Sequence, residues 1–176
     1  MVTLEPASTA LVLVDLMPRI IDLPLGPRSG TETLDAACAL AERFRAGGAS
    51  VVAVRTERPN VVEQSPGSEL HQRVAALADA VVVKGTIGGF HHTDLHELLQ
   101  GRDVSTLVLA GIATNMGVES TARAASDHDY ELVFVEDAMT ALTTAEHQAA
   151  ITLNLPRFGQ VTSSPELTLR VAATPS

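Results

Sequence analysis

The chain has 176 residues, 45% of them hydrophobic, and a formal net charge of −9 from 21 acidic and 12 basic side chains. This length allows one substantial hydrophobic core and is too short for two comfortable domains, so we expect a single domain over residues 1–176. The acidic balance and the lack of any Lys/Arg-rich run argue against nucleic acid or an anionic membrane as a partner.

The amino-terminal sequence and the single cysteine indicate a cellular compartment. Residues 1–7 lack the basic and apolar regions of a signal peptide, and the longest apolar run, 10–14, is too short to span a bilayer. Cys38 is the only cysteine, which rules out an internal disulfide and is compatible with a reducing environment. We therefore expect a cytoplasmic protein.

Apolar runs rich in Val and Leu predict the strands. They lie at residues 10–16, 50–55, 80–84, 106–112 and 131–136, with a weaker run at 160–163. Nearly continuous hydrophobicity is typical of strands that are buried on both faces, as in a parallel sheet.

Segments with helical periodicity alternate with these runs. Leu34, Cys38 and Ala41 share one face of a predicted helix that ends at Gly47 and Gly48. Further helices are predicted at residues 93–100, 115–128 and 143–155. The alternation predicts an α/β fold with three layers, a doubly wound parallel sheet and right-handed crossovers.

In such a fold, ligands bind beyond the carboxyl ends of the strands. Asp15 ends the first predicted strand, Lys84 ends the third, and the polar turn 113–117 follows the fourth and opens a helix. We expect these three segments to meet on one rim of the sheet. The same rim is expected to carry Arg55 and Glu57 after the second strand and Asp137 after the fifth.

Four sequence blocks cover almost the whole chain in order. They are 10–15 (ALVLVD), 83–84 (VK) followed by 89–95 (GFHHTDL), 111–125 (GIATNMGVESTARAA) and 135–138 (VEDA). In sequence and spacing they resemble the isochorismatase-like, or cysteine hydrolase, superfamily. The resemblance implies a six-stranded parallel sheet, a cis peptide bond before Ala113, and a homodimer or higher homo-oligomer that acts on a small molecule.

The resemblance also implies catalytic roles for Asp15, Lys84 and position 117. In the amide-hydrolysing members, the Asp takes the proton of a Cys thiol, the Lys orients the Asp, and the thiolate attacks the substrate carbonyl. The N–H groups of Ala113 and residue 117 would form the oxyanion hole. Position 117 is glycine here, so no acyl-enzyme can form there. Cys38 does not replace it, because its helical spacing indicates a core position.

Glycine at this position also occurs in the true isochorismatases and in a related enzyme of phenazine biosynthesis, which this chain resembles. There the Asp is a general acid that protonates a vinyl ether, and no nucleophilic side chain is needed. The resemblance thus implies secondary metabolism. The segment 84–90 (KGTIGGF) lacks the Arg and Tyr that those enzymes direct at isochorismate, so a different substrate is expected. Arg55 or Arg19 could supply the missing cation.

Small and apolar residues around the predicted rim favour an apolar substrate, although the same residues could pack a lid or a subunit interface. The residues predicted to contact substrate are Met17, Ile20, Arg55, Ile87, Phe90, Ala113, Asn115 and Met116.

The histidines do not indicate a metal site. The segment 56–60 (TERPN) lacks the Asp-x-His of the metal-dependent members, and only His71 follows it before the third strand. The adjacent His91 and His92 would point in different directions. We expect no metal and no cofactor. His96, His128 and His147 are predicted to be exposed helix residues.

Three functions remain compatible with the sequence. The favoured one is a hydrolase without covalent catalysis, in which Asp15 is the general acid or base, Lys84 assists it, and backbone N–H groups near Gly117 bind an oxyanion. The second is a binding protein that keeps the fold without the reaction. The third is a Cys-to-Gly variant of a cysteine amidohydrolase.

Overall fold

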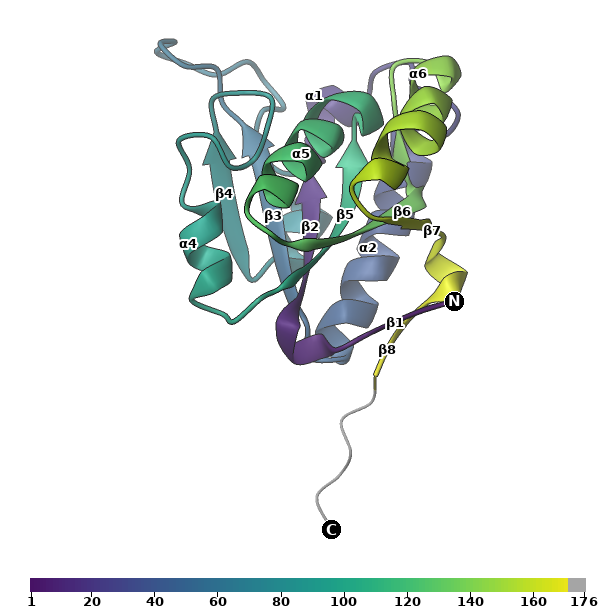
Figure 1. Cartoon of the computed structure of the whole chain (residues 1–176). Helices are drawn as coiled ribbons and strands as arrows, with labels where there is room; N and C mark the ends of the chain where they lie inside the picture. Colours follow the sequence, from purple (N-terminus) through teal and green to yellow (C-terminus); the bar gives the residue numbers. More distant parts are fainter. Residues whose placement is uncertain (171–176) are drawn as a thin grey trace.

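The protein is described by a computed structural model over residues 1–170. Its centre is a six-stranded, all-parallel sheet with the order β4-β3-β2-β5-β6-β7, which confirms the predicted doubly wound α/β fold (Figure 1). The strands are β2 (Thr9–Val14), β3 (Ser50–Thr56), β4 (Ala80–Lys84), β5 (Thr106–Ile112), β6 (Glu131–Thr140) and β7 (Gln160–Thr162).

Helices cover both faces of this sheet. The α-helices are α1 (Pro18–Ile21), α2 (Gly30–Ala46), α3 (Gln72–Leu77), α4 (Leu95–Gln100), α5 (Glu119–Asp127) and α6 (Thr144–Ala149). Shorter 3-10 and π segments are η1 (Pro6–Ser8), η2 (Thr114–Val118), η3 (Ala150–Asn154), η4 (Leu155–Arg157) and η5 (Ser164–Glu166). In Figure 1, α4, α5 and α6 lie in front of the sheet and α2 lies behind it.

Alternation along each strand builds two hydrophobic cores. In β2, Leu11 and Leu13 join the core under α2 and α3, whereas Val12 and Val14 join the core under α4 and α5. All four side chains are fully buried. This burial on both faces explains the nearly continuous apolar sequence of the central strands.

Three features differ from the sequence prediction. A second, two-stranded sheet pairs β1 (Val2–Leu4) with β8 (Leu167–Leu169) in parallel, and it was not predicted. Strand β2 ends at Val14 because Asp15 takes the left-handed backbone conformation, with φ 53°. Strand β6 continues past Asp137 to Thr140 with a register shift against β5.

The longer β6 makes the predicted position of Asp137 wrong. Its Oδ1 accepts a hydrogen bond of 2.7 Å from the Ser164 backbone N–H, and the residue lies within the strand rather than beyond its end. Asp137 therefore orders the segment after β7 and does not line the rim.

Gly111 in β5 lies close against the backbone of its partner in β2, Val14. Gly111 has φ 122°, and an added Cβ would lie 2.2 Å from the Val14 carbonyl oxygen. We expect Gly111→Ala to lower the free energy of unfolding by roughly 3 kcal/mol or more, because backbone strain and a clash with the neighbouring strand combine. Gly48→Ala is the matched control, since Gly48 has φ 80° but no atom within 4 Å of an added Cβ. It should cost only about 1 kcal/mol in urea unfolding; equal losses would contradict this account.

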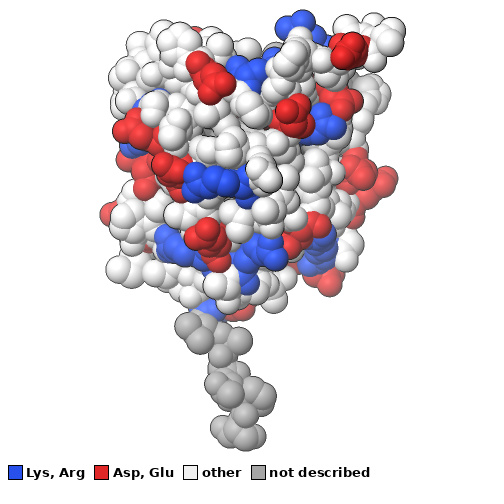
Figure 2. All heavy atoms as spheres, turned by 180° about the vertical axis from the view of Figure 1, so that it is seen from behind, with Lys and Arg blue, Asp and Glu red and all other residues white. Residues whose placement is uncertain are grey.

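The described surface carries mixed charges. Figure 2 shows basic and acidic side chains interspersed on the face opposite to the view of Figure 1. Within residues 1–170, none of the helices is long and apolar enough to cross a membrane.

Candidate functional site

The carboxyl ends of the central strands form a cleft with two neighbouring lobes. The first lobe has a volume of about 340 Å³ and the second about 240 Å³, and both contain Asp15, Ile20 and Gly117. The first is also lined by Met17, Arg19, Thr56, Lys84, Gly85, Thr86 and Ile87. The second is also lined by Leu23, Leu25, Ile112, Ala113, Met116 and Leu142. The sequence-predicted rim is therefore a hollow of a size suited to a small molecule.

Asp15 and Lys84 form an ion pair at the bottom of this cleft. The Lys84 Nζ donates to Asp15 Oδ2 at 2.9 Å, and the two side chains are 2% and 13% exposed respectively. Asp15 is held in place from behind, because its backbone N–H donates to the Val54 carbonyl at 2.8 Å. Its left-handed backbone turns the carboxylate out of the strand direction and into the cleft.

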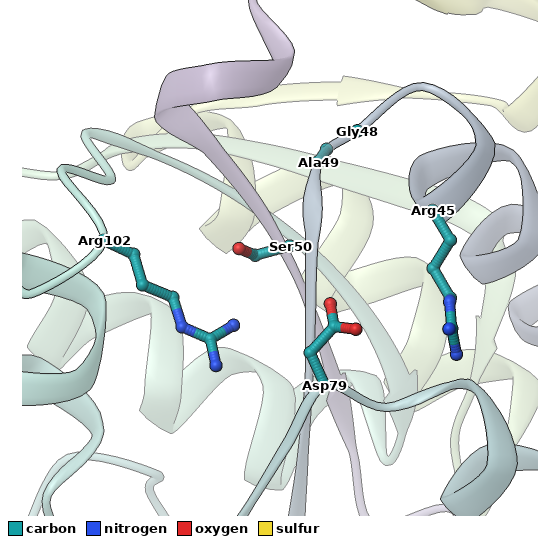
Figure 3. Close-up of a pocket in the computed structure, with 6 residues that line it drawn as sticks. All are labelled: Arg45, Gly48, Ala49, Ser50, Asp79 and Arg102. Atoms are coloured by element: carbon teal, nitrogen blue, oxygen red, sulfur yellow. The ribbon is translucent and has the colours of Figure 1, made fainter.

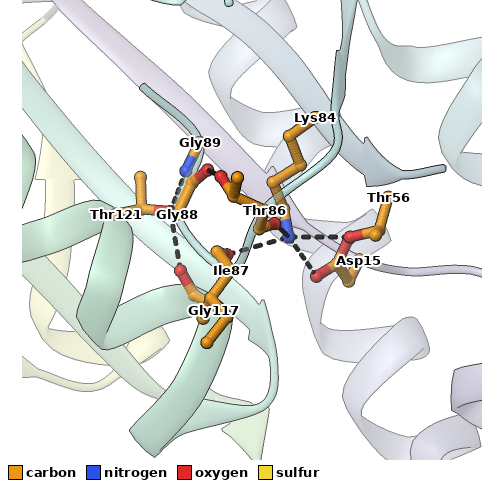
Figure 4. Close-up of polar contacts among 9 residues, drawn as sticks. All are labelled: Asp15, Thr56, Lys84, Thr86, Ile87, Gly88, Gly89, Gly117 and Thr121. Atoms are coloured by element: carbon orange, nitrogen blue, oxygen red, sulfur yellow. Dashed lines mark hydrogen bonds and ion pairs between the residues drawn. The ribbon is translucent and has the colours of Figure 1, made fainter. Parts of the chain in front are cut away.

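Thr56, a residue with no predicted role, completes the network. Its hydroxyl donates to Asp15 Oδ1 at 2.9 Å and accepts from Lys84 Nζ at 2.7 Å (Figure 4). Lys84 also donates to the Ile87 carbonyl at 2.9 Å and lies 3.2 Å from that of Thr86. The register of the sheet explains the contact, since Thr56 pairs with Lys84 across β3 and β4. Both oxygens of the Asp15 carboxylate are thus fixed by neighbours.

The turn after β5 brings a helix start to the same carboxylate. The Ile112–Ala113 peptide bond is cis, and η2 begins at Thr114 as a π-helical turn that leads into α5. The Thr121 hydroxyl donates to the Gly117 carbonyl at 2.6 Å and accepts from the Gly89 N–H at 3.0 Å. Thr121 therefore connects the helix to the loop that follows Lys84.

Gly117 faces the Asp15 carboxylate directly. A Cβ added at this position would lie 3.1 Å from Asp15 Oδ2 and 3.0 Å from Val14 Cγ1. Both distances are shorter than usual for a Cβ contact, so a side chain at this position requires its neighbours to shift by a few tenths of an ångström. Any side chain at 117 would touch the carboxylate, and glycine leaves that volume to the cleft.

Five of the eight predicted substrate-contacting residues line the cleft. Met17, Ile20 and Ile87 line the first lobe, while Ile20, Ala113 and Met116 line the second.

The other three lie outside the cleft lining. Phe90 is buried against the rings of His128 and Tyr130. Arg55 is paired with Glu57 at 2.6 Å and lines a separate cavity. Asn115 lies in the helix start, and among residues 1–170 its buried Oδ1 has no hydrogen-bond partner.

His147 is buried, at 1% exposure, so the prediction that it is an exposed helix residue is wrong. Its Nδ1 lies 2.8 Å from the Thr114 hydroxyl, next to the Ala113 turn. The sequence signal that could have placed it is its helical spacing from Ala150 and Ile151, which open η3 directly after α6 and are also buried. Burial, and secondarily the charge of Arg28, lower the pKa of His147 below its ordinary value of 6.5.

This shift predicts a pH dependence of stability. The unfolded chain binds a proton at His147 more readily than the folded protein, so stability should fall as the pH drops below about 6.5. His147→Gln keeps a side chain able to reach Thr114 but does not titrate. Urea unfolding at pH 7.5 and 5.5 should therefore show a smaller loss for the variant than for the wild type; equal losses would contradict the assignment.

Cys38 lies in α2, fully buried in the core under that helix and away from the cleft. Burial raises the pKa of its thiol, which disfavours the reactive thiolate. We expect a disulfide reagent such as dithionitrobenzoate to modify Cys38 only after unfolding, at least about a hundredfold faster in denaturant than in buffer. Rapid modification of the folded protein would show that the thiol is accessible and would reopen its assignment as a core residue.

A further cavity of about 400 Å³ lies at the opposite end of the sheet (Figure 3). Two of its charged side chains have structural partners: Asp79 accepts from the Val51 N–H at 2.8 Å, and Arg45 donates to the carbonyls of Ala76 and Leu77. It is remote from the carboxyl ends of the strands, where ligands bind in such folds.

The other histidines are not among the residues that line the cleft. The prediction that His96 is exposed is wrong, because it is half-buried, with its Nδ1 3.0 Å from the Tyr130 hydroxyl and its ring stacked on that of His128. His71 caps α3, where its Nδ1 accepts from the Arg73 N–H at 3.3 Å. His91 and His92 are exposed beside α4. Over residues 1–170, no three His, Cys, Asp or Glu side chains are grouped as metal ligands.

The sequence and the fold of this chain are similar to those of known proteins. Residues 9–166 match the isochorismatase domain. The isochorismatase family protein YecD of Escherichia coli O157:H7 is 36% identical, over 95% of this chain and 98% of that protein. The solved structure of an isochorismatase family protein from Burkholderia thailandensis has a TM-score of 0.82 and 35% identity, covering 95% of this chain and 96% of that one. The ureidoacrylate amidohydrolase RutB of Rhizobium rhizogenes is 28% identical, over 89% of this chain and 80% of its own length. The chain therefore belongs to the isochorismatase-like hydrolase family.

Proposed function

We infer that this family member hydrolyses a small metabolite without a covalent intermediate. Asp15 serves as the general acid or base, and Lys84 and Thr56 orient its carboxylate. Backbone N–H groups at Ala113 and Gly117 bind the oxyanion or a carboxylate of the substrate.

The observation that carries this proposal is the position of Gly117 beside Asp15 Oδ2. The place where a side chain would contact the carboxylate holds none, as the 3.1 Å distance from an added Cβ shows. The chain's only thiol, Cys38, is buried in the core under α2 and α3 and does not line the cleft. A carboxylate facing an open cleft can instead act on water or on the substrate itself.

Two versions of the chemistry fit this arrangement. With a vinyl ether, the protonated Asp15 gives its proton to the enol carbon, water adds to the resulting cation and returns a proton to the Asp15 carboxylate, and the neutral adduct breaks down to an alcohol and a carbonyl compound. With an ester or amide, Asp15 takes a proton from water while the water oxygen bonds to the carbonyl carbon of the substrate. Asp15 then passes this proton to the leaving group. In both, Lys84 balances the charge on Asp15.

The Asp15–Lys84 pair favours a working enzyme over a protein that only binds. Burying two charges is costly, and it adds little to folding compared with apolar packing. A silent binding protein has no need of the pair. A Cys-to-Gly variant of an amidohydrolase would have the same site. It would differ from the proposed enzyme in having no turnover of its own.

A compound screen tests the proposal. Purified protein is incubated with vinyl ethers, esters and amides of small carboxylic acids, and products are followed by mass spectrometry. We expect turnover of at least one class, retained at the same rate by Cys38→Ala, which removes the only thiol. Lack of turnover throughout would favour the binding protein or the inactive variant, and loss in Cys38→Ala alone would contradict the noncovalent mechanism.

A further inference from the structure

We propose that Arg19 is the anion-binding residue of the cleft, and that the substrate carries a carboxylate joined to an apolar group. This inference concerns the same cleft as the proposed function and specifies its substrate class.

Arg19 enters the first lobe from α1. The Arg19 backbone N–H donates to the Gly67 carbonyl at 3.1 Å, which fixes the residue between α1 and the loop before α3. An added Cβ at Gly67 would lie 3.0 Å from the Arg19 nitrogen, so the two segments are packed closely. The side chain then lines the same cavity as Asp15, Lys84 and Gly117.

The guanidinium group of Arg19 is incompletely satisfied. Its Nε is buried, and among residues 1–170 it has no hydrogen-bond partner. Over the same range no carboxylate forms an ion pair with Arg19. A buried N–H donor is costly to leave unpaired, and an arginine fork matches a carboxylate with two parallel hydrogen bonds.

The charge balance of the cleft leaves Arg19 available. Lys84 is neutralised by Asp15, and Arg55 is neutralised by Glu57 outside the cleft. Arg19 is therefore the remaining positive charge on the first lobe's lining. An anionic substrate would bring the charge that this lobe lacks, despite the net charge of −9 on the whole chain.

The second lobe is the apolar part of the cleft. Apart from Asp15, its lining is side chains without polar groups, and Leu23, Met116 and Leu142 are 40%, 46% and 52% exposed. Large apolar side chains grouped at the mouth of a cavity favour an apolar ligand group. Since both lobes share Asp15 and Gly117, one molecule can hold its carboxylate at Arg19 and its apolar group in the second lobe.

Binding of three probes tests this inference without requiring turnover. Phenylacetate, phenylacetamide and acetate are titrated into wild-type protein at fixed ionic strength, with the Gly117 backbone amide as the NMR reporter. We expect phenylacetate to bind about tenfold or more tightly than either of the others. Arg19→Gln should remove the preference for phenylacetate over phenylacetamide while leaving phenylacetamide affinity unchanged.

Arg58→Gln is the matched control. Arg58 is exposed on the neighbouring loop, contacts Gln64 through its backbone, and carries the same charge. This variant should keep the preference. Equal binding of the acid and its amide by wild type, or an unchanged preference in Arg19→Gln, would overturn the role of Arg19. Equal binding of acetate and phenylacetate would overturn the inference that the second lobe binds an apolar group of the substrate. A protein that shows the preference but turns over nothing would contradict the proposed function alone.

Discussion

Replacing Gly117 by Cys is expected to convert the cleft into an esterase that forms an acyl-enzyme. The new Cβ would lie 3.1 Å from Asp15 Oδ2, so the thiol would begin next to a base that Lys84 already orients. It would also stand in the first turn of a helix, where backbone N–H groups favour a thiolate. Hydrolysis of p-nitrophenyl acetate should rise by roughly 10²-fold or more over the wild type, with a burst of one nitrophenol per active site.

Two companion variants make this result specific. Gly117→Ala adds the same Cβ without sulfur and should show no burst. Gly117→Cys combined with Asp15→Asn should lose most of the gained rate, because the thiol no longer has its base. A Gly117→Cys protein that folds normally and stays inert would contradict the assignment of position 117 as the point where the substrate carbonyl meets the catalytic groups.

Replacing Asp15 by Asn should lower kcat of the wild-type reaction by about 10²–10⁴-fold, the usual contribution of a general acid or base. The same change should also destabilise the protein by about 3 kcal/mol, since Lys84 is 2% exposed and would keep a buried charge without its partner. Activity must therefore be compared with the folded fraction, measured by circular dichroism at the assay temperature.

A double variant separates the two effects. Asp15→Asn with Lys84→Met removes both charges and should recover part of the lost stability, while turnover stays at the level of Asp15→Asn. Recovery of turnover together with stability would mean that Asp15 acts only through folding. Unchanged kcat in folded Asp15→Asn would rule out its role as acid or base.

The strands, and the convergence of Asp15, Lys84 and the 113–117 turn, follow from local sequence patterns, whereas the catalytic roles of these residues are implied by the resemblance to the superfamily. Buried parallel strands are apolar throughout, so their carboxyl ends can be located; Asp15 and Lys84 lie at such ends, and Gly117 lies in the helical turn that follows β5. Their arrangement around one cleft is a consequence of the parallel sheet. The two residues that end β4 and follow β2, Lys84 and Asp15, are accordingly in contact at 2.9 Å.

The features that sequence did not predict depend on long-range packing. Strands β1 and β8 have three residues each and pair across almost the whole chain, so neither shows a recognisable period. Thr56 joins the site through its register with Lys84, which only the sheet order reveals. The burial of His147 depends on the contact of α6 and η3 with η2. Arg55 was predicted to contact substrate, with Arg19 named only as an alternative cation, but in the fold Arg55 is paired with Glu57 and Arg19 lines the first lobe.

The central claim is hydrolysis by Asp15 without a covalent enzyme intermediate. Intact-protein mass spectrometry of the wild type, quenched in acid during steady-state turnover in ¹⁸O-labelled water, tests it most directly. The account predicts an enzyme of unchanged mass and one ¹⁸O atom in the product from the first turnover. An enzyme population heavier by the substrate's acyl or alkyl group, on Thr56, Asp15 or any other residue, would contradict it.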